Sequence, residues 1–489
     1  MDSIGQAEIV RRLTQHNLWW SQPLGLALPE SEFPKRVYFN PFKALALNFS
    51  VRRATILLGP RRVGKTFMVK QLIHDAIQDG FDPDAILYAA MDTPVYAGVS
   101  LEQFLDFFPK DKGNERRLVI FDEIQYLWNW EVHLKNLVDN YPNTKFIALG
   151  SAAAALKLKS TESGAGRFSD FMLPPLTFYE FLTFLGEEAE LVDEIERDGK
   201  PECRAKDIDA LNTRFIDYLN YGGYPEAVLN KDIRSNSEQF IRNDIIDKVL
   251  LKDLPSLYGI SDIQQLNKLF SFLAYNAGAE ASLENISQKS GISKPTIRRY
   301  IEYLESAFLI IKLPTVDENC KTLQRQRNFK VYLNNPSMRA ALFGPASIDE
   351  TDKIGHLTES AIFAQWQHSQ SFRQLRYARW KNEGEVDVVY LSTDKPKPLW
   401  LGEISWSDDI ANKYGKATRS IATMLKTHKK TVMAAFLTTK TLTTATEIEG
   451  LRIPIWPSAL YCYFVGKNIT TNLEKLMLES VTLKAAKPL

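Results

Sequence analysis

The chain has 489 residues, of which 45% are hydrophobic and 24% charged. This is the composition of an ordinary globular protein of about three domains, and it excludes a small binding module or a disordered chain. The 60 Lys and Arg residues nearly balance the 59 Asp and Glu residues, for a net charge of +1, so only local basic patches could contact DNA.

Cysteine use and hydropathy indicate the compartment. The three cysteines, Cys203, Cys320 and Cys462, are scattered and odd in number, which favours a reducing compartment over a disulfide framework or a thiolate zinc site. The sequence has no apolar stretch of about 18 residues, and residues 1–15 lack the apolar core of a signal peptide. We therefore expect a cytoplasmic protein with no membrane partner.

The first third of the chain has an α/β pattern. Residues 1–48 are predicted to form an N-terminal helical segment, and residues 49–177 an α/β core. Apolar strands are expected at 54–58, 85–90, 117–121 and 145–149, alternating with helices. Such an alternation predicts a parallel sheet with right-handed crossovers.

The remaining residues divide into three predicted parts. Residues 178–260 have a helical pattern and are predicted to form a lid, with an exposed acidic excursion at 186–200. Residues 261–335 combine short helices with an apolar strand and are predicted to form a winged helix. Residues 336–489 have a mixed pattern, with strands near 386–391 and 399–404, and are predicted to form an α/β C-terminal domain.

A phosphate-binding loop is predicted between the first strand and its helix. The residues are Gly59, Pro60, Arg61, Arg62, Val63, Gly64, Lys65 and Thr66, which fit the pattern G-x4-G-K-S/T. Glycines let successive N–H groups turn toward phosphate oxygens, Lys65 supplies charge to the β and γ phosphates, and Thr66 offers a hydroxyl to Mg²⁺. The nucleotide contacts are expected to extend to Phe67. ATP and Mg²⁺ are the expected cofactors.

Acidic and polar residues follow two further strands. Asp122 is placed to organise the metal and its water, and Glu123 to polarise the attacking water, which predicts hydrolysis. Ser151 follows the next strand and is placed like a sensor of the γ-phosphate; a simple helix N-cap is the alternative.

The motifs in this order resemble AAA-type (AAA_14-like) ATPases that carry a DUF4143 C-terminal region, near the origin-recognition and STAND branches. The resemblance rests on the loop at 59–66, on Phe121-Asp-Glu-Ile-Gln, on Gly150-Ser151, on Gly166-Arg167 before Pro175-Leu-Thr-Phe-Tyr-Glu-Phe-Leu, on Tyr221-Gly-Gly-Tyr-Pro-Glu and on Thr296-Ile-Arg-Arg-Tyr. It covers roughly residues 40 to 410. It implies a mobile-element or defence context without deciding between them.

The resemblance makes Arg167 the candidate arginine that senses phosphate charge, within the subunit or across an interface. A surface salt bridge is the alternative for this residue. Arg61 and Arg62 could also face a neighbouring subunit or DNA, or could simply be solvated loop charges.

A helix-turn-helix is predicted at 283–304. Ser293 caps its second helix, whose apolar residues recur at three and four residue steps. This leaves Lys294, Thr296, Arg298 and Arg299 on the exposed side as candidate DNA contacts. A following basic patch, Lys321, Arg325, Arg327 and Lys330, could contact phosphates. Protein docking is the alternative for this module.

The C-terminal domain resembles the restriction-endonuclease-like fold. Glu359, Asp387 and Glu403 stand where such domains carry metal-binding carboxylates, but Ser405 replaces the expected lysine. We therefore expect a vestigial site without cleavage, unless Lys381 or Lys413 supplies the missing charge.

These features predict a Mg²⁺-dependent ATPase that acts as a nucleotide-controlled switch on DNA or on a protein partner, with a homo-oligomer also open. A nucleotide-stabilised scaffold without turnover and a metal-dependent nuclease effector are the alternatives. The intact Glu123 argues against the first alternative, and Ser405 argues against the second.

Overall fold

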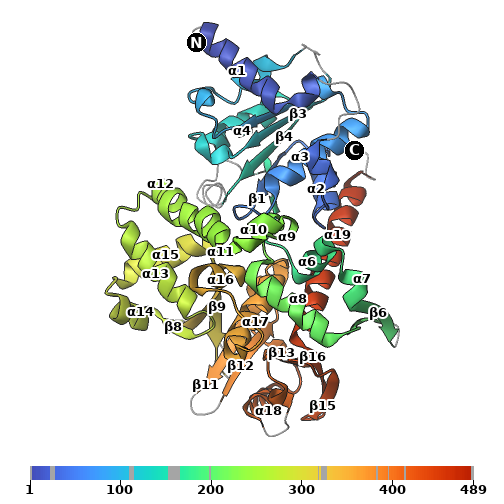
Figure 1. Cartoon of the computed structure of the whole chain (residues 1–489), viewed down its shortest axis with the longest axis vertical. Helices are drawn as coiled ribbons and strands as arrows, with labels where there is room; N and C mark the ends of the chain where they lie inside the picture. Colours follow the sequence, from blue (N-terminus) through green and yellow to red (C-terminus); the bar gives the residue numbers. More distant parts are fainter. Residues whose placement is uncertain are drawn as a thin grey trace. The chain divides into compact units, whose positions relative to one another are not determined.

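The computed structural model describes the chain except residues 1–2, 22–27, 110–114, 152–165, 198–199, 318, 321–327, 381–383, 395, 412–414 and 486–489. The chain divides into two compact units. The first unit comprises Met1–Pro174 together with Thr471–Leu489, and the second comprises Pro175–Thr470. Figure 1 labels most of their helices and strands.

The first unit is built on a parallel sheet. Its elements are α1 (Ser3–His16), α2 (Phe39–Ala46), β1 (Ala54–Leu58), α3 (Lys65–Gln78), β2 (Ile86–Ala90), β3 (Arg117–Asp122), α4 (Trp130–Asn140), β4 (Thr144–Gly150) and β5 (Phe168–Met172). The sheet has five strands in the order β2-β3-β4-β1-β5, all parallel. The predicted parallel α/β core is therefore confirmed. β5 was not predicted, because only one of its five residues is buried and it has no apolar run.

The strand register aligns the carboxyl ends of the central strands. Leu58 of β1 pairs with Gly150 of β4, Phe121 of β3 pairs with Ala148 of β4, and Asp122 pairs with Ala90 of β2. The residues that follow β1, β3 and β4 therefore meet at one edge of the sheet, where ligands bind in open α/β folds.

The N-terminal segment covers the edge strand β2. The Asn17 side chain donates to the carbonyl of Tyr88 at 2.8 Å and accepts from its N–H at 2.7 Å. The indoles of Trp19 and Trp20 both donate to the carbonyl of Ile86, at 3.1 and 2.8 Å. Side chains thus satisfy backbone groups that an open sheet edge would leave exposed.

The second unit begins with helices and a short hairpin. Its first elements are α6 (Phe178–Leu185), α7 (Glu188–Leu191), β6 (Val192–Arg197), β7 (Lys200–Ala205), α8 (Ile208–Tyr221), α9 (Pro225–Leu229), α10 (Lys231–Ser235), α11 (Ser237–Phe240), α12 (Leu254–Tyr258) and α13 (Ile263–Tyr275). The acidic excursion expected at 186–200 is in fact α7 and most of an antiparallel hairpin, β6 with β7.

The rest of the second unit is organised around a large mixed sheet. Its elements are β8 (Glu280–Ser282), α14 (Leu283–Ser290), α15 (Lys294–Ser306), β9 (Ile310–Val316), β10 (Asn328–Leu333), α16 (Ser337–Phe343), α17 (Thr351–Trp366), β11 (Leu375–Trp380), β12 (Gly384–Leu391), β13 (Pro398–Glu403), α18 (Lys416–His428), β14 (Ala434–Thr439), β15 (Thr444–Ile448) and β16 (Leu451–Pro457). The last helix, α19 (Ser458–Ala485), starts in this unit, and its residues from Thr471 onward belong to the first unit.

Strands from two predicted domains form this one sheet. Its order is β15-β16-β14-β13-β12-β11-β9-β10-β8. The join is a short parallel pairing in which Tyr377 and Ala378 of β11 face Thr315 and Val316 of β9. A buried apolar cluster includes residues of β11 to β14, β16 and α18, and it takes in Val316 of β9.

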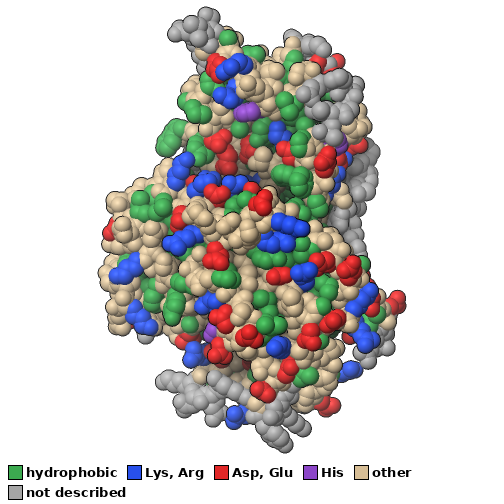
Figure 2. Space-filling view, viewed as in Figure 1, with side chains coloured by type: hydrophobic (Ala, Val, Ile, Leu, Met, Phe, Trp, Pro, Cys, Tyr) green, Lys and Arg blue, Asp and Glu red, His purple; other side chains and the backbone are tan. Residues whose placement is uncertain are grey.

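Charges of both signs are interspersed over the face shown in Figure 2, as the near-equal counts of 60 basic and 59 acidic residues predict. Among the residues that the structure describes, no helix has the length and hydropathy needed to cross a membrane.

Candidate functional site

The loop between β1 and α3 needs glycine at two positions. Gly64 immediately precedes α3 with a φ of 94°, a left-handed conformation that suits glycine. A Cβ added to Gly59 would lie 2.2 Å from the carbonyl oxygen of Leu173, which follows β5. The chain therefore turns closely around the amino end of α3, where helix N–H groups have no intrahelical partner and can bind an anion.

Two cations hold this loop. Lys65 is buried, and its Nζ donates to the carbonyls of Gly59 at 3.0 Å and Pro60 at 2.7 Å. Arg36 is also buried and donates to the carbonyls of Val63 at 2.9 Å and Pro174 at 3.0 Å. Lys65 thus lies over the loop in the place from which it could reach a phosphate. Arg36 was not predicted, because no motif marks an arginine that acts on distant carbonyls.

A hydroxyl and a carboxylate meet at the start of α3. Thr66 Oγ1 donates to Asp122 Oδ2 at 2.7 Å, and the Tyr88 phenol donates to the same oxygen at 2.7 Å. Thr66 is exposed, whereas Asp122 is buried. Burial and the charge of Asp122 raise the pKa of Tyr88, which keeps the phenol a donor. Because hydroxyl and carboxylate oxygens suit Mg²⁺, Thr66 and Asp122 fit the predicted metal. Tyr88 was not predicted, since it stands within an apolar strand.

Glu123 lies immediately beyond β3 in a left-handed conformation, with a φ of 52°. Its Oε2 accepts a hydrogen bond from Nε2 of Gln125. The carboxylate predicted to orient water is therefore already bound by a neutral side chain two residues later. The spacing of these residues in the sequence did not predict this contact.

Ser151 follows β4, the strand that lies between β1 and β3. The residue is 1% exposed, and its hydroxyl has no hydrogen-bond partner among the residues that the structure describes. A buried hydroxyl without a partner costs about 1–3 kcal/mol, so this position favours a ligand oxygen. The alternative helix N-cap would involve residues 152–165, which lie outside the described residues.

The other predicted nucleotide contacts differ in exposure. Pro60 and Val63 are buried, Arg61 is half-buried, and Arg62 is exposed. Phe67 is 41% exposed on α3, and its ring packs edge-on against an aromatic ring of the preceding segment at 5.3 Å between centroids.

The structure does not bring Arg167 to the phosphate-binding loop. Its carbonyl accepts from the N–H of Ala54, so it lies at the amino ends of β1 and β5, whereas the loop follows the carboxyl end of β1. Its guanidinium forms an ion pair with Asp139 at 2.5 Å. The predicted role within one subunit is thus not supported by this geometry, which matches the surface salt bridge. A role across an interface stays a prediction.

The residues of the predicted helix-turn-helix lie on α14 and α15 and around the turn between them. α14 ends at Ser290 and is followed by Gly291, which has a φ of 75°, and Ser293 caps α15. Arg298 and Arg299 are exposed, and Thr296 is half-buried. Lys294 is exposed but forms an ion pair with Glu284 of α14. The two arginines are therefore the stronger candidates for contact with phosphates.

The C-terminal carboxylates do come together. The Lys330 ammonium lies 3.3 Å from Asp387 Oδ1 and 3.8 Å from Glu359 Oε2, and Glu403 is buried against Asp387. Lys330 was predicted to contact phosphates from the surface; this was wrong, because its side chain is only 4% exposed. Lys381 and Lys413 lie outside the described residues, as do Lys321, Arg325 and Arg327.

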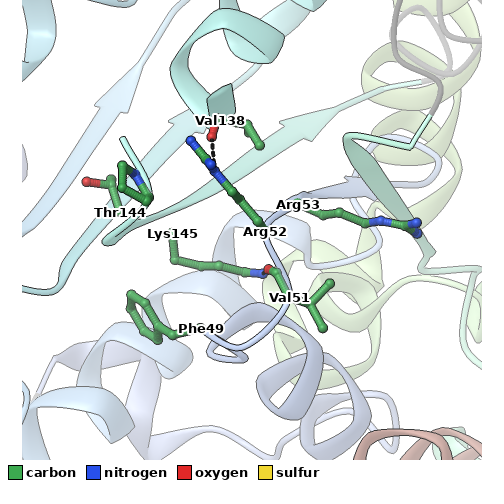
Figure 3. Close-up of a pocket in the computed structure, with 8 residues that line it drawn as sticks. Phe49, Val51, Arg52, Arg53, Val138, Thr144 and Lys145 are labelled. Carbon is green, nitrogen blue, oxygen red and sulfur yellow. Dashed lines mark hydrogen bonds between the residues drawn. The ribbon is translucent and has the colours of Figure 1, made fainter. Parts of the chain in front are cut away.

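A small cavity lies at the opposite, amino-terminal edge of the first sheet. Figure 3 shows Lys145, Val51 and Arg52 around it, with Arg52 donating to the carbonyl of Val138. Its volume is about 10 Å³, room for about one water molecule. Lys145 Nζ donates to the carbonyls of Asn48 at 3.1 Å and Val51 at 3.2 Å. The cavity is too small for a nucleotide.

Burial lowers the pKa of Lys145 to about 8. Between pH 8 and the ordinary lysine value of about 10.4, the unfolded chain binds the proton and the folded chain does not, so this residue makes stability rise with pH, by at most about 1.4 kcal/mol per unit. We expect Lys145→Met to remove that contribution. Denaturant unfolding at pH 8.0 and 9.5 measures it, with Lys135→Met on α4 as the control. Parallel pH profiles for wild type and Lys145→Met would contradict the assignment.

Sequence relatives span only part of the chain. An uncharacterized protein of Haemophilus influenzae is 25% identical over 310 residues, which is 62% of this chain and 72% of that protein. Two uncharacterized proteins of Methanocaldococcus jannaschii are 24% and 26% identical, each over 56% of this chain. The matched region spans 59% and 60% of the lengths of these two archaeal proteins.

Likeness to solved structures is slight. The Orc1 protein of Aeropyrum pernix in complex with DNA matches with a TM-score of 0.30 and 12% identity, over 66% of this chain and 95% of that chain. The replication initiator DnaA of Aquifex aeolicus bound to AMPPCP matches with a TM-score of 0.27 and 13% identity, over 57% of this chain and 89% of that chain. At these values neither likeness assigns a function.

Two family models match separate segments. Residues 212–349 match a domain of unknown function, DUF8612, so the expected DUF4143 region is not shown. Residues 51–182 match the AAA_14 model, described as an AAA domain. That segment contains the loop after β1, the buried Asp122 and the sheet edge where they meet. The match and the geometry agree that residues 51–182 form a P-loop domain of the AAA type.

Proposed function

We propose that this chain is a Mg²⁺-dependent ATPase whose nucleotide state controls its engagement with DNA or a protein partner. The observation that carries the proposal is the 2.7 Å hydrogen bond between Thr66 and Asp122, beside a buried Lys65 held over the loop. These residues come from β3 and from the loop and helix after β1, and they meet at the carboxyl edge of the sheet.

Nucleotide binding follows from the loop. The amino end of α3 and the backbone N–H groups after Gly59 bind phosphate oxygens. Lys65 exchanges its two carbonyl contacts for a charge-assisted contact with the β and γ phosphates. Thr66 and Asp122 would hold Mg²⁺, which when bound neutralises phosphate charge.

Hydrolysis needs a positioned water. Glu123 stands one residue beyond Asp122, and its carboxylate orients and polarises the attacking water once it leaves Gln125. The Ser151 hydroxyl has no hydrogen-bond partner within the described ranges and follows β4, between β1 and β3, from where it contacts the γ-phosphate. A nucleotide that draws Glu123 away from Gln125 therefore changes the conformation at this edge of the sheet. This conformational change is the switch that we propose.

Nucleotide affinity tests the loop assignment. We expect Lys65→Ala to weaken the binding of a non-hydrolysable ATP analogue by about 10- to 100-fold, because a hydrogen bond to a charged group contributes about 1.5–3 kcal/mol. Calorimetric titration measures this. Lys135→Ala, a half-buried lysine on α4, is the control and should bind like wild type. Equal affinity of Lys65→Ala and wild type would remove the basis of the proposal.

DNA binding is the proposed output, on the observation that Arg298 and Arg299 are both exposed on α15. We expect the double alanine variant to bind duplex DNA less tightly and to lower the slope of log K against log salt by about 2, since two fewer counterions are released. Anisotropy at several salt concentrations measures it. Arg419→Ala/Lys426→Ala on α18 is the control. An unchanged slope would favour protein docking by this module.

The alternatives remain distinct in what they predict. A scaffold without turnover would bind ATP but release no phosphate, and a nuclease effector would cleave DNA in a metal-dependent way. The cytoplasmic location, the mobile-element or defence context and assembly into a homo-oligomer are parts of the proposal that rest on sequence resemblance and composition.

A further inference from the structure

A buried lysine stands among acidic side chains of the second unit. Lys330 lies on β10, and its side chain is 4% exposed. The ammonium lies 5.4 Å from the centroid of the Tyr377 ring on β11 and reaches the carboxylates of β12. There it forms ion pairs with Glu385 and with Asp387, the latter at 3.3 Å. On the other side it lies 3.8 Å from Glu359 of α17.

The carboxylates around it outnumber the cation. Besides the ammonium, Asp387 accepts from the N–H of Ile404 at 3.0 Å, and Glu359 accepts from the Tyr332 phenol at 2.9 Å. Glu403 is 6% exposed, and its Oε1 has no hydrogen-bond partner within the described part of the chain. A buried acid facing another acid must be protonated or share a cation.

The pKa shifts of the buried acids agree with this crowding of carboxylates. Burial is the main cause that raises the pKa of Glu359, and the charge of Asp387 raises it further. The same two causes raise the pKa of Glu403. Lys330 is the group that opposes both increases. Without a cation at this place, these acids would repel one another in a site with little water.

A divalent cation would ordinarily serve this purpose between carboxylates. In the part of the chain that the structure describes, no group of three or more His, Cys, Asp or Glu side chains is arranged to hold a metal ion. The lysine expected at position 405 is absent, and the Ser405 hydroxyl instead accepts from the N–H of Ser407 at 3.1 Å. A positive charge is therefore supplied from β10 rather than from β13.

We infer that the Lys330 ammonium occupies the place that a divalent cation would take among Glu359, Asp387 and Glu403, so that this cluster binds no divalent cation while Lys330 is present. An ammonium donates protons to carboxylates but cannot carry a metal-bound water. A side chain of the same chain thus closes this cluster of carboxylates to a metal ion. This inference is independent of the ATPase proposal.

Manganese binding, measured by electron paramagnetic resonance without nucleotide, tests the inference. In the wild-type background, Asp387→Asn should leave the number of bound Mn²⁺ ions unchanged. Lys330→Met should bind one more Mn²⁺ than wild type, and adding Asp387→Asn should abolish that gain. The matched control is Lys312→Met on β9, next to β10, which should gain no site.

Thermal unfolding tests the inference even if the Lys330→Met variant folds poorly. We expect Lys330→Met to unfold at a lower temperature than wild type and to recover by several degrees in Mn²⁺, because a ligand that binds only the folded state stabilises it. In wild type, Mn²⁺ should not raise the unfolding midpoint by binding to this cluster. Lys330→Gln, which keeps a donor for one carboxylate, is the second variant and should behave in the same way.

Three outcomes would overturn the inference. One is a wild-type Mn²⁺ site that is lost on Asp387→Asn. Another is folded Lys330→Met and Lys330→Gln proteins that gain no Mn²⁺. Metal-dependent cleavage of duplex DNA by wild type, lost on both Asp387→Asn and Lys330→Met, would also overturn it, because Lys330 would then assist a bound metal rather than replace one.

Discussion

Glu123→Gln should lower steady-state ATP turnover by at least about 100-fold while leaving nucleotide affinity close to wild type. General-base catalysis contributes about 10²- to 10⁴-fold, and the amide keeps the size of the side chain but loses the charge that polarises water. Lys65 and Thr66 are untouched by this change, so binding should persist. Phosphate release at saturating ATP and Mg²⁺, with and without DNA, gives turnover, and calorimetry gives affinity.

Glu115→Gln is the matched control for that experiment. Glu115 is exposed just before β3, at the opposite end of the strand from Glu123, and should leave turnover unchanged. Equal turnover by Glu123→Gln and wild type would refute the assigned role of Glu123. Absence of turnover in wild type, with nucleotide affinity intact, would instead support the scaffold alternative.

Gly59→Ala should both destabilise the first unit and abolish measurable nucleotide binding. The added Cβ would lie 2.2 Å from the carbonyl oxygen of Leu173, and this is backbone that cannot rotate away. Overpacking of a buried site costs about 1–3 kcal/mol, and the loop must shift to relieve it. Because Lys65 donates to the carbonyl of Gly59, the shift also displaces the lysine. Denaturant unfolding and nucleotide titration measure the two effects.

Gly5→Ala on α1 is the control for the glycine experiment, since among the described residues no atom beyond its chain neighbours and the backbone of its own helix lies within 4 Å of an added Cβ. Alanine in a helix is favoured over glycine by about 0.5–1 kcal/mol, so this variant should be neutral or slightly stabilised. Wild-type stability and nucleotide affinity in Gly59→Ala would show that the loop does not have the described geometry.

The residues that we propose to bind phosphate could be predicted because their signals are local. Gly59, Gly64 and Lys65 lie within one turn and one helix start, and an apolar strand runs directly into Asp122. The partners of these residues could not be predicted. Tyr88 and Arg36 reach the site only because the sheet order and the packing of the preceding segment bring distant positions together.

The positions of Arg167 and Lys330 depend on contacts at longer range. Arg167 follows a glycine as the resemblance requires, but β5 is parallel to β1 and therefore starts at the edge away from the loop. Lys330 stands in a basic stretch that looks exposed, yet its side chain contacts Asp387, 57 positions later in the chain. Charge density along a sequence does not reveal which side chains a sheet buries.

The amino-acid sequence by itself determined the α/β class of the first unit, its parallel strands, the glycine-containing loop after β1 and the amphipathic helices α14 and α15, since these depend on residue periodicity and on glycine at fixed positions. The tertiary structure alone decided which side chains meet. It joined strands from two predicted domains into one sheet and placed Glu123 against Gln125. It also put Lys330 among the acids. These contacts depend on strand order and burial over long separations, which no local pattern encodes.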